Sequence, residues 1–312
     1  MKFNYDKLQI DFCDYDFPTD REEFSLDAFL SASKEIPTSG YFVLPYEEIA
    51  CQGPDTLTFL QGLTTNDVFG VNSGKAIRTL FLYSSGKILC DSILRKEGDV
   101  IYISVEADVK EKLLKYLDYF HITEKVEFSE SEKSNYYCLA YGAQITDGLL
   151  IKEDFYDLLL APANKKPEEF FSDNFQRLDL RQFLGARFFL NFPLAGLDYK
   201  NEPYPHEIGW EKYVSFVKGC YIGQEPVSRM ENKVRAAKVI RNLDCQKYLS
   251  PGEKIYIDEK EAGEIRTSSK LPFNGMYYSF GMVRTKLFKD ENQRLANSEN
   301  VTLELHASNN SN

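Results

Sequence analysis

The sequence predicts an α+β protein built from two ferredoxin-like α+β halves and a small C-terminal β-barrel. In the first half, a strand, a helix, three strands, a helix and a strand follow one another between residues 40 and 130, an order typical of ferredoxin-like domains. A second round of strand-like runs and a helix occupies residues 134–186. After residue 236, short β-branched and aromatic runs are separated by Gly, Pro and Asn, which is typical of a barrel.

The elements of the first half follow from residue type and spacing. Residues 40–53 are rich in β-branched and aromatic residues, as strands are. Pro54 and Asp55 suit a first helical turn, and the turn compositions SSGK and KEGD divide the long apolar stretch that follows into three strands. We therefore expect a strand at 40–53, a helix at 54–67, a three-stranded meander at 75–106, an amphipathic helix at 107–120 and a strand at 122–130.

The rest of the chain is assigned in the same way. We expect strands at 134–143 and 148–163, a helix at 167–186, a helix start at 223–226, and barrel strands at 238–245, 252–258, 262–269, 277–288 and 301–307. The predicted domains are an acidic N-terminal arm (1–35), a region of two halves (about 36–132 and 133–240), a barrel (241–306) and a disordered tail (307–312).

Composition limits the classes of function. The chain has 312 residues and a formal net charge of −11, and an acidic chain is repelled by polyphosphate, so we expect no direct nucleic-acid binding. No apolar run approaches ~18 residues, so no membrane span is expected. The six cysteines are far apart and the three histidines show no paired spacing, which predicts free thiols in the cytoplasm and no metal site. Without a heptad pattern, a monomer is expected.

One segment, KGCYIGQE at residues 218–225, has an order of residues that a packed core does not require. The stretch from Gly223 to Pro226 is typical of a helix start. Cys220 would then lie just before a helix N-terminus and two residues from Lys218, and both features favour a thiolate. The alternative is that the cysteine is a small buried apolar residue and the lysine a solvated turn charge.

This segment resembles the KGCYxGQE signature of the YgfZ-type proteins, which are relatives of the glycine-cleavage T-protein, an aminomethyltransferase, and include the mitochondrial iron–sulfur maturation factors. All seven fixed positions match: Lys218, Gly219, Cys220, Tyr221, Gly223, Gln224 and Glu225. The resemblance extends over roughly residues 40–240, through GPDTLTFLQGLTTND (53–67), SSGKILCD (84–91), RFFLNFPLAGLD (187–198), PHE (205–207) and Arg229. Asn191 stands where the family usually has a glycine, and Lys233 stands where it often has one.

The resemblance implies a three-part clover-leaf fold that binds tetrahydrofolate or a derivative. Folate needs polar partners for its pterin edge, apolar or aromatic walls, and cations for its glutamate tail. The implied catalytic residues are Cys220, as a reactive thiol near the folate site, and Asp91, as a carboxylate near the reactive nitrogen. The implied folate-binding residues are Asn66, Asp67, Asp91, Arg187, Glu207, Lys218 and Arg229.

Each of these residues also has a purely structural interpretation. Asn66 and Asp67 are equally suited to capping a helix and a turn. Glu207 is compatible with a surface acid, and Arg187 with a salt bridge instead of a ligand carboxylate. The basic run at 233–241 is compatible with binding a polyglutamate tail, but it is more typical of a solvated face.

The resemblance therefore favours one function and leaves two alternatives. The favoured function is a tetrahydrofolate-binding accessory factor for assembly or repair of iron–sulfur proteins, which would be its partners, with an indirect effect on tRNA modification through such enzymes. The first alternative is a one-carbon transferase of the aminomethyltransferase type. The second is a non-catalytic folate-binding module that acts through a partner.

Overall fold

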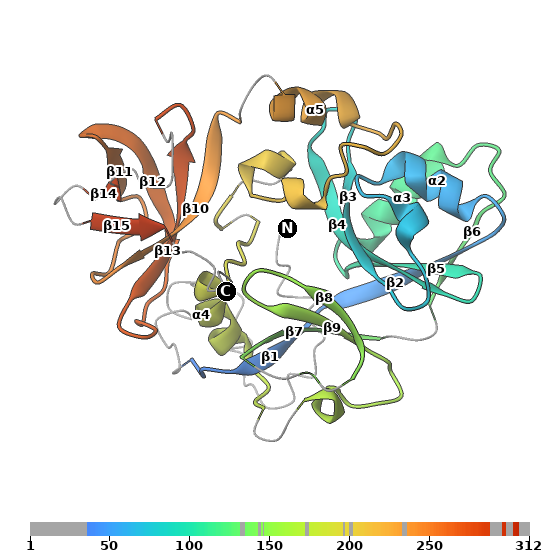
Figure 1. Cartoon of the computed structure of the whole chain (residues 1–312), viewed down its shortest axis with the longest axis horizontal. Helices are drawn as coiled ribbons and strands as arrows, with labels where there is room; N and C mark the ends of the chain where they lie inside the picture. The colour runs from blue at the N-terminus through green and yellow to red at the C-terminus, as the bar shows by residue number, and fades with distance from the viewer. Residues whose placement is uncertain are drawn as a thin grey trace, which may run out of the picture. The chain divides into compact units, whose positions relative to one another are not determined.

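A computed structural model describes residues 36–131, 135–142, 145, 147–171, 175–195, 197–199, 202–232, 236–287, 295–297 and 302–305. The chain divides into two compact units, and Figure 1 labels their elements. Unit 1 comprises residues 43–175 and 201–236, and unit 2 comprises the described parts of 2–42, 176–200 and 237–312. The predicted arm (1–35) and tail (307–312) lie outside the described residues.

The first half of unit 1 has the predicted order of elements. The chain passes through β2 (Tyr46–Gln52), α2 (Thr56–Leu63), the 3-10 helix η2 (Val68–Gly70), β3 (Ile77–Leu82), β4 (Ile88–Glu97), β5 (Val100–Glu106), α3 (Lys110–Phe120) and β6 (Glu127–Glu130). The strands form one antiparallel sheet in the order β3-β4-β5-β2-β6. Leu60 of α2 and Leu117 of α3 share one apolar core with Phe81 and Ile103 of the sheet, and Figure 1 shows the two helices beside these strands.

Proline divides the first predicted strand. Residues 40–53 form β1 (Gly40–Leu44) and β2, with Pro45 between them. Proline has no N–H to donate to a sheet ladder, so the two strands join different sheets. The second sheet has the order β1-β7-β9-β8, with β7 (Tyr136–Tyr141), β8 (Leu149–Lys152) and β9 (Asp157–Ala161) in unit 1 and β1 at the boundary between the units.

The predicted helix at 167–186 is wrong in its extent. The structure has a 3-10 helix, η3 (Pro167–Phe170), and then α4 (Leu180–Phe189). The side chain of Asp179 accepts from the backbone N of Gln182, and the Gln182 side chain accepts from the backbone N of Asp179. The helix therefore begins after Asp179 and not at residue 167, because this capping box satisfies two of the backbone N–H groups that the start of a helix leaves unpaired. Three shorter helices follow in unit 1: η4 (Pro205–Glu207), η5 (Glu211–Tyr213) and α5 (Gln224–Asn232).

The C-terminal strands close into a barrel, as predicted. Its order is β10-β13-β12-β11-β14-β15, with β10 (Lys238–Cys245), β11 (Lys254–Ile257), β12 (Lys260–Ser268), β13 (Tyr277–Arg284), β14 (Leu295–Ala296) and β15 (Thr302–Leu305). The interior is apolar and includes Leu243, Ile255, Ile265, Val283 and Leu303. The two-residue strand β14 was not predicted, because two residues are too few to show an alternating pattern. Within the described residues, no helix is long and apolar enough to cross a membrane.

A buried ion pair connects α4 to the barrel within unit 2. Arg187 is 1% exposed, and its Nη1 lies 2.5 Å from Oδ2 of the fully buried Asp198. The same carboxylate accepts from the backbone N of Leu194, and the Thr267 hydroxyl donates to it. Asn191, at the position where a glycine was expected, has a φ of 50°. Asn tolerates this left-handed conformation better than most residues do.

We predict that Arg187→Met lowers the free energy of unfolding by about 3–5 kcal/mol, because it leaves the Asp198 carboxylate buried without its cation. Adding Asp198→Asn should restore a substantial part of this loss, since an amide oxygen still accepts from Leu194 N. The matched control is Arg229→Met, which removes an ion pair with Glu225 whose side chains are 62% and 84% exposed and should cost less than about 1 kcal/mol. Thermal and denaturant unfolding measure all three. Equal losses at both arginines would contradict the prediction.

Candidate functional site

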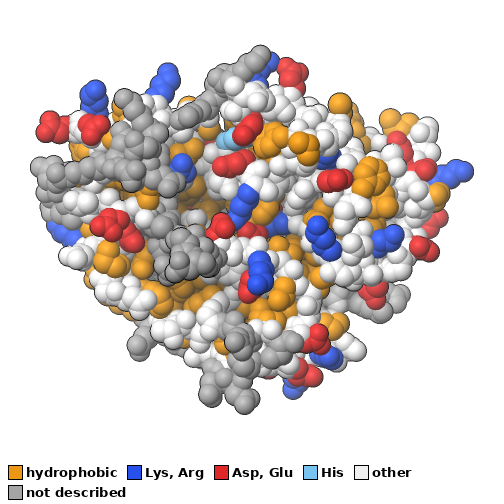
Figure 2. Space-filling view, viewed as in Figure 1, with side chains coloured by type: hydrophobic (Ala, Val, Ile, Leu, Met, Phe, Trp, Pro, Cys, Tyr) orange, Lys and Arg blue, Asp and Glu red, His pale blue; other side chains and the backbone are white. Residues whose placement is uncertain are grey.

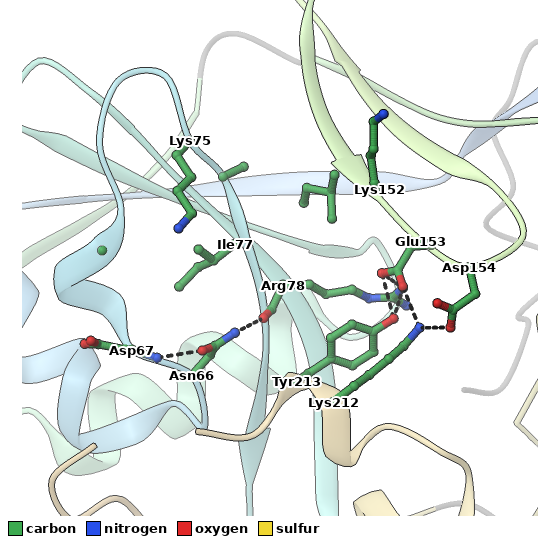
Figure 3. A pocket seen from close by; sticks show the side chains of 13 residues that line it. Asn66, Asp67, Lys75, Ile77, Arg78, Lys152, Glu153, Asp154, Lys212 and Tyr213 are labelled. Carbon is green, nitrogen blue, oxygen red and sulfur yellow. Dashed lines mark hydrogen bonds and ion pairs between the residues drawn. The ribbon is translucent and has the colours of Figure 1, made fainter. Parts of the chain in front are cut away.

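Unit 1 contains a pocket of about 450 Å³ between β3, the end of β8 and η5. This volume lies within the range of small-molecule sites. The apolar part is formed by Ala76, Ile77 and Ile151, and polar and charged side chains surround it (Figure 3). The polar and charged lining residues are Asn66, Asp67, Lys75, Arg78, Lys152, Glu153, Asp154, Lys212 and Tyr213.

The guanidinium of Arg78 organises one end of the pocket. It extends from β3 and is 4% exposed. Its Nη2 lies 2.9 Å from Oδ2 of Asp91 on the neighbouring strand β4, and its Nη1 lies 3.1 Å from Oε1 of Glu153 in the turn after β8. Nη1 also donates to the hydroxyl of Tyr213. One buried cation therefore connects the five-stranded sheet, the β8–β9 turn and η5.

Lys212 completes this group, which we call the Arg78 cluster (Arg78, Asp91, Glu153, Lys212 and Tyr213). Its Nζ lies 2.7 Å from Oε2 of Glu153 and 3.1 Å from Oδ2 of Asp154, and Tyr213 donates to Oε1 of Glu153 at 2.7 Å. Figure 3 shows the side chains of Arg78, Lys212 and Tyr213 converging on Glu153. Burial raises the pKa of Glu153, but the charges of Arg78 and Lys212 outweigh this effect, so the net pKa is lowered and the carboxylate is ionised at neutral pH.

Asn66 and Asp67 lie on the opposite side of the pocket, in the turn between α2 and η2. The Asn66 side chain donates to the carbonyl of Arg78 and accepts from the backbone N of Asp67. The Asp67 carboxylate accepts from Gln61 Nε2 and from the backbone N of Phe69, and it caps η2. Both residues therefore shape the turn and also line the pocket.

Lys218 fixes the position of this turn. Its Nζ donates to the carbonyls of Gln61, Thr64 and Asn66, at 2.7, 2.7 and 2.9 Å. An ammonium group has three donors, so all of them are used on the backbone at the end of α2. Burial lowers the pKa of Lys218 to about 8, while the charge of Asp67 acts in the opposite direction. Lys218 is thus placed to support Asn66 and Asp67, and it does not itself line the pocket.

The signature segment, residues 218–225, packs against the β3–β4 hairpin through Gly223. This glycine has a φ of 81°, and a Cβ there would lie 2.5 Å from the carbonyl oxygen of Tyr83. On the hairpin, Gly86 has a φ of 80°, and a Cβ there would lie 2.8 Å from Cβ of Pro226 and 3.3 Å from the carbonyl oxygen of Gly223. The backbone N of Ile222 donates to the carbonyl of Gly62. The signature segment and the β3–β4 hairpin are far apart in the sequence, but they pack so closely at Gly223 and Gly86 that neither position has room for a side chain.

Cys220 places an exposed thiol in this segment. Among the five described cysteines, it alone is exposed, whereas Cys51, Cys90, Cys138 and Cys245 are buried. Gly219 beside it has open space around its Cα, while Tyr221 is buried. The segment is therefore anchored on both sides of a thiol that remains accessible. Gln224 and Glu225 begin α5, as the helix-start composition predicted.

The remaining predicted binding residues do not line the pocket. Arg187 lies in unit 2, in its buried pair with Asp198. Glu207 accepts from the backbone N of Tyr204 at the start of η4, and the exposed Arg229 pairs with Glu225. Asp91 does not line the pocket. Its carboxylate accepts from Arg78, which does line the pocket, and from the hydroxyl of Tyr46.

The basic run at 233–241 is only partly described, since residues 233–235 are outside the described ranges. Of its other cations, Lys238 is exposed on β10 and Arg241 lies in the same strand. On the face shown in Figure 2, basic side chains alternate with acidic ones and form no continuous basic surface. Within the described ranges, no group of three or more His, Cys, Asp or Glu side chains is arranged to hold a metal ion.

Four members of the Arg78 cluster were not predicted from the sequence: Arg78, Glu153, Lys212 and Tyr213. A signal for the first was present, because Arg78 is the single charge in the apolar strand IRTLFL, and a buried charge requires a partner. The partners gave no such signal. Glu153 and Lys212 come from a turn and a short 3-10 helix that lie 75 and 134 positions further along the chain, and acids and lysines are common in such segments.

Comparisons with known proteins agree with this architecture. No protein-family model matches the chain. It is 24% identical to an uncharacterized protein of Haemophilus influenzae, over 81% of this chain and 92% of that protein. It is 23% identical to an aminomethyltransferase of Lysinibacillus sphaericus, over 72% of each chain. The crystal structure of the glycine cleavage system aminomethyltransferase T from Bartonella henselae matches with a TM-score of 0.66 at 15% identity, over 90% of this chain and 88% of that one. The chain shares this fold, which confirms the predicted α+β class with a C-terminal barrel.

The two signature glycines should differ sharply in their tolerance of a side chain. We predict that Gly223→Ala lowers the free energy of unfolding by about 1–3 kcal/mol, because a positive φ is strained with a Cβ and the Tyr83 carbonyl must move. Gly219→Ala, two residues from the signature tyrosine, meets no atom within 4 Å and should be nearly neutral. Denaturant unfolding of both variants checks this. Comparable losses at the two positions would show that the close contact is not what requires glycine.

Lys218 should leave a signature in the pH dependence of stability. Its pKa in the folded protein is lowered to about 8, below the ordinary value near 10.4. Between these values the unfolded chain binds more protons than the folded one, so this lysine makes stability rise with pH in that window. We therefore predict that the stability of the wild type relative to Lys218→Met increases from pH 8 to about pH 10. A relative stability that falls with pH would mean that the three carbonyl bonds to the ammonium outweigh its burial.

Proposed function

We propose that this chain binds a reduced folate in the pocket of unit 1 and acts as an accessory factor for the assembly or repair of iron–sulfur proteins. The observation that carries the proposal is the pocket itself, which combines an apolar floor with hydrogen-bonding groups and several cations. The shared fold with aminomethyltransferases and the complete signature at 218–225 support the choice of ligand. Iron–sulfur proteins are proposed as clients because that signature resembles the one found in iron–sulfur maturation factors.

The pocket residues fit the chemistry of a folate. Ile77, Ile151 and the Tyr213 ring offer the apolar and aromatic surface that a pterin needs, and Asn66 and Glu153 offer polar atoms at its rim. Arg78 Nε is buried and has no hydrogen-bond partner among the described residues. A buried donor without a partner is costly, and it leaves the guanidinium with one unused donor beside the pocket lining. The lining lysines Lys75, Lys152 and Lys212 suit the carboxylates of a glutamate tail.

Cys220 is the residue proposed to act on the client. Its thiol is exposed, and Lys218 and Gly223 hold the backbone on either side of it. The thiol does not line the pocket, so binding of the folate and the action of the thiol are separable. This division distinguishes the proposal from a site in which the cysteine binds the folate directly.

A one-carbon transferase of the aminomethyltransferase type is the second candidate. The buried carboxylate of Asp91, held by Arg78 and Tyr46 next to the pocket, favours it, as does the likeness to an aminomethyltransferase. Formation of methylene-folate from an aminomethyl-loaded lipoyl carrier protein would establish this activity. Asp91→Asn should then abolish it while leaving folate binding in place.

We predict micromolar or tighter binding of tetrahydrofolate by the full-length protein, measured by calorimetric titration under reducing conditions. Cys220→Ala should bind equally well, because the thiol lies outside the pocket lining. Gly70→Tyr should weaken binding by about tenfold or more, a loss of about 1.4 kcal/mol, because Gly70 lines the pocket. The matched control is Gly74→Tyr, since Gly74 is also exposed but does not line it.

The outcomes separate the parts of the proposal. Absence of binding to the wild type would remove the folate, and loss of binding in Cys220→Ala alone would place the thiol in the ligand site. For the cellular role, a deletion strain should lose activity of iron–sulfur enzymes under oxidative stress, and Cys220→Ala should fail to restore it. Full restoration by this variant would support the non-catalytic binding module instead.

A further inference from the structure

We propose that the exposed apolar side chains beside Cys220 form a docking surface for the client protein, and that the segment of the client that docks there is apolar and flanked by basic residues. This inference rests on the proposed function, which supplies the client. The docking surface consists of Phe69, Phe216, Val217 and the thiol of Cys220. All four residues are exposed, and all belong to unit 1.

Val217 is the clearest sign of a partner. It is 97% exposed, more than any other large hydrophobic residue of the described chain, and Phe216 beside it is 39% exposed. Lys218, which separates Val217 from Cys220 in the sequence, directs its ammonium onto three backbone carbonyls at the end of α2. The apolar pair and the thiol are therefore presented to solvent by one short segment whose backbone is held in place.

Backbone contacts bring Phe69 to the same surface. The backbone N of Ser215 donates to the carbonyl of Thr65 at 2.9 Å, and Thr65 Oγ1 donates to the carbonyl of Tyr213 at 2.8 Å. The segment that leads to Cys220 thus runs alongside the turn that leads into η2, where Phe69 is 59% exposed. Single exposed apolar residues are ordinary, but a group of them marks an interaction site.

The edge of the docking surface is acidic. Asp67 is exposed next to η2, and its carboxylate bonds only to an amide side chain and a backbone N among the described residues. Glu231 of α5 is exposed as well, and its Oε2 lies 3.0 Å from Nε2 of His206. The His206 ring lies beside the ring of Phe216, with the centroids 6.3 Å apart. A carboxylate therefore lies near each of the two aromatic residues of the surface.

The cations of the same segments are already used. Residues 213–232 contain one lysine and one arginine, and residues 64–70 contain neither. Lys218 donates to the three carbonyls, and Arg229 lies 2.8 Å from Oε1 of Glu225. Opposite charges across an interface accelerate association and select the partner. The acidic edge thus points to a client segment that carries Lys or Arg beside its apolar residues.

The test measures how fast Cys220 exchanges with three peptides, in the full-length chain with Cys13→Ser so that no thiol of the N-terminal arm contributes. Each peptide has a central cysteine in a mixed disulfide with 2-nitro-5-thiobenzoate. The Cys220 thiolate attacks the peptide sulfur, a protein–peptide disulfide forms, and the coloured thiobenzoate leaves. The first peptide has Leu and Phe around the cysteine and Lys at both ends. The second has Glu in place of Lys, and the third has Ser and Asn in place of Leu and Phe.

The basic apolar peptide should react about tenfold faster than either of the others. Val217→Ser should slow this peptide about fivefold and leave the rate of the Ser and Asn peptide unchanged, because only an apolar partner uses the valine. Glu231→Gln should reduce the preference for Lys over Glu about twofold, and high salt should reduce it too. Cys220→Ala in the same background gives the release that does not come from this thiol.

The matched control is Ile122→Ser, which changes an 83% exposed apolar residue that follows α3 in the same unit and should alter none of the three rates. Iodoacetamide, a small neutral reagent, should alkylate Cys220 equally fast in every variant, which separates docking from the reactivity of the thiol. Thermal unfolding shows whether each variant is folded.

Equal rates for the three peptides, or a preference that survives Val217→Ser in folded protein, would overturn the proposal. The proposed function is tested separately, by titration of tetrahydrofolate and by restoration of a deletion strain. Val217 does not line the folate pocket, so Val217→Ser should bind tetrahydrofolate as the wild type does. Failure of the docking surface and failure of the proposed function are therefore distinguishable.

Discussion

The buried guanidinium of Arg78 is the interaction on which unit 1 depends. A charge in an apolar strand is unfavourable unless it is paired and hydrogen-bonded, and here Asp91 and Glu153 provide the pairs. Because Glu153 belongs to the turn after β8, satisfying Arg78 brings a second sheet against the first. Tyr213 and Lys212 of η5 then bind the same glutamate. One wall of the proposed folate pocket therefore forms because the charge of Arg78 has to be neutralised.

The signature segment serves the same region from the other side. Lys218 holds the carbonyls at the end of α2, and Gly223 allows the segment to contact the β3–β4 hairpin. In a segment with so many chemically active side chains, Lys218 and Gly223 therefore have structural roles. Cys220 is left as the one exposed thiol of the described chain. A thiol on an anchored turn suits a function in which a client protein must approach the sulfur from one fixed direction.

The fold was predictable to the extent that local patterns decide it. Alternating and helical periodicities placed most strands and the helices α2 and α3 correctly, because these elements bury one face and show it in the sequence. The start of α5 was predicted from the composition of residues 223–226. The helix at 167–186 was not predicted correctly, since the capping box at Asp179 and Gln182 selects a late start that apolar periodicity does not reveal. The candidate site was less predictable. Asn66 and Asp67 were identified from the sequence, but Arg187 belongs to a buried pair in unit 2.

The sequence by itself determined the class of fold, the closed barrel and the presence of an unusual cysteine segment, since each of these is encoded in contiguous residues. Only the tertiary structure decided which charges meet. Arg78 and Glu153 are 75 positions apart and Lys218 and Gln61 are 157 apart, and no local pattern relates them. The physical reason is that pairing of buried charges and donors is set by where the packed sheets bring them together. Local propensity acts over a few residues, and these contacts act across the whole unit.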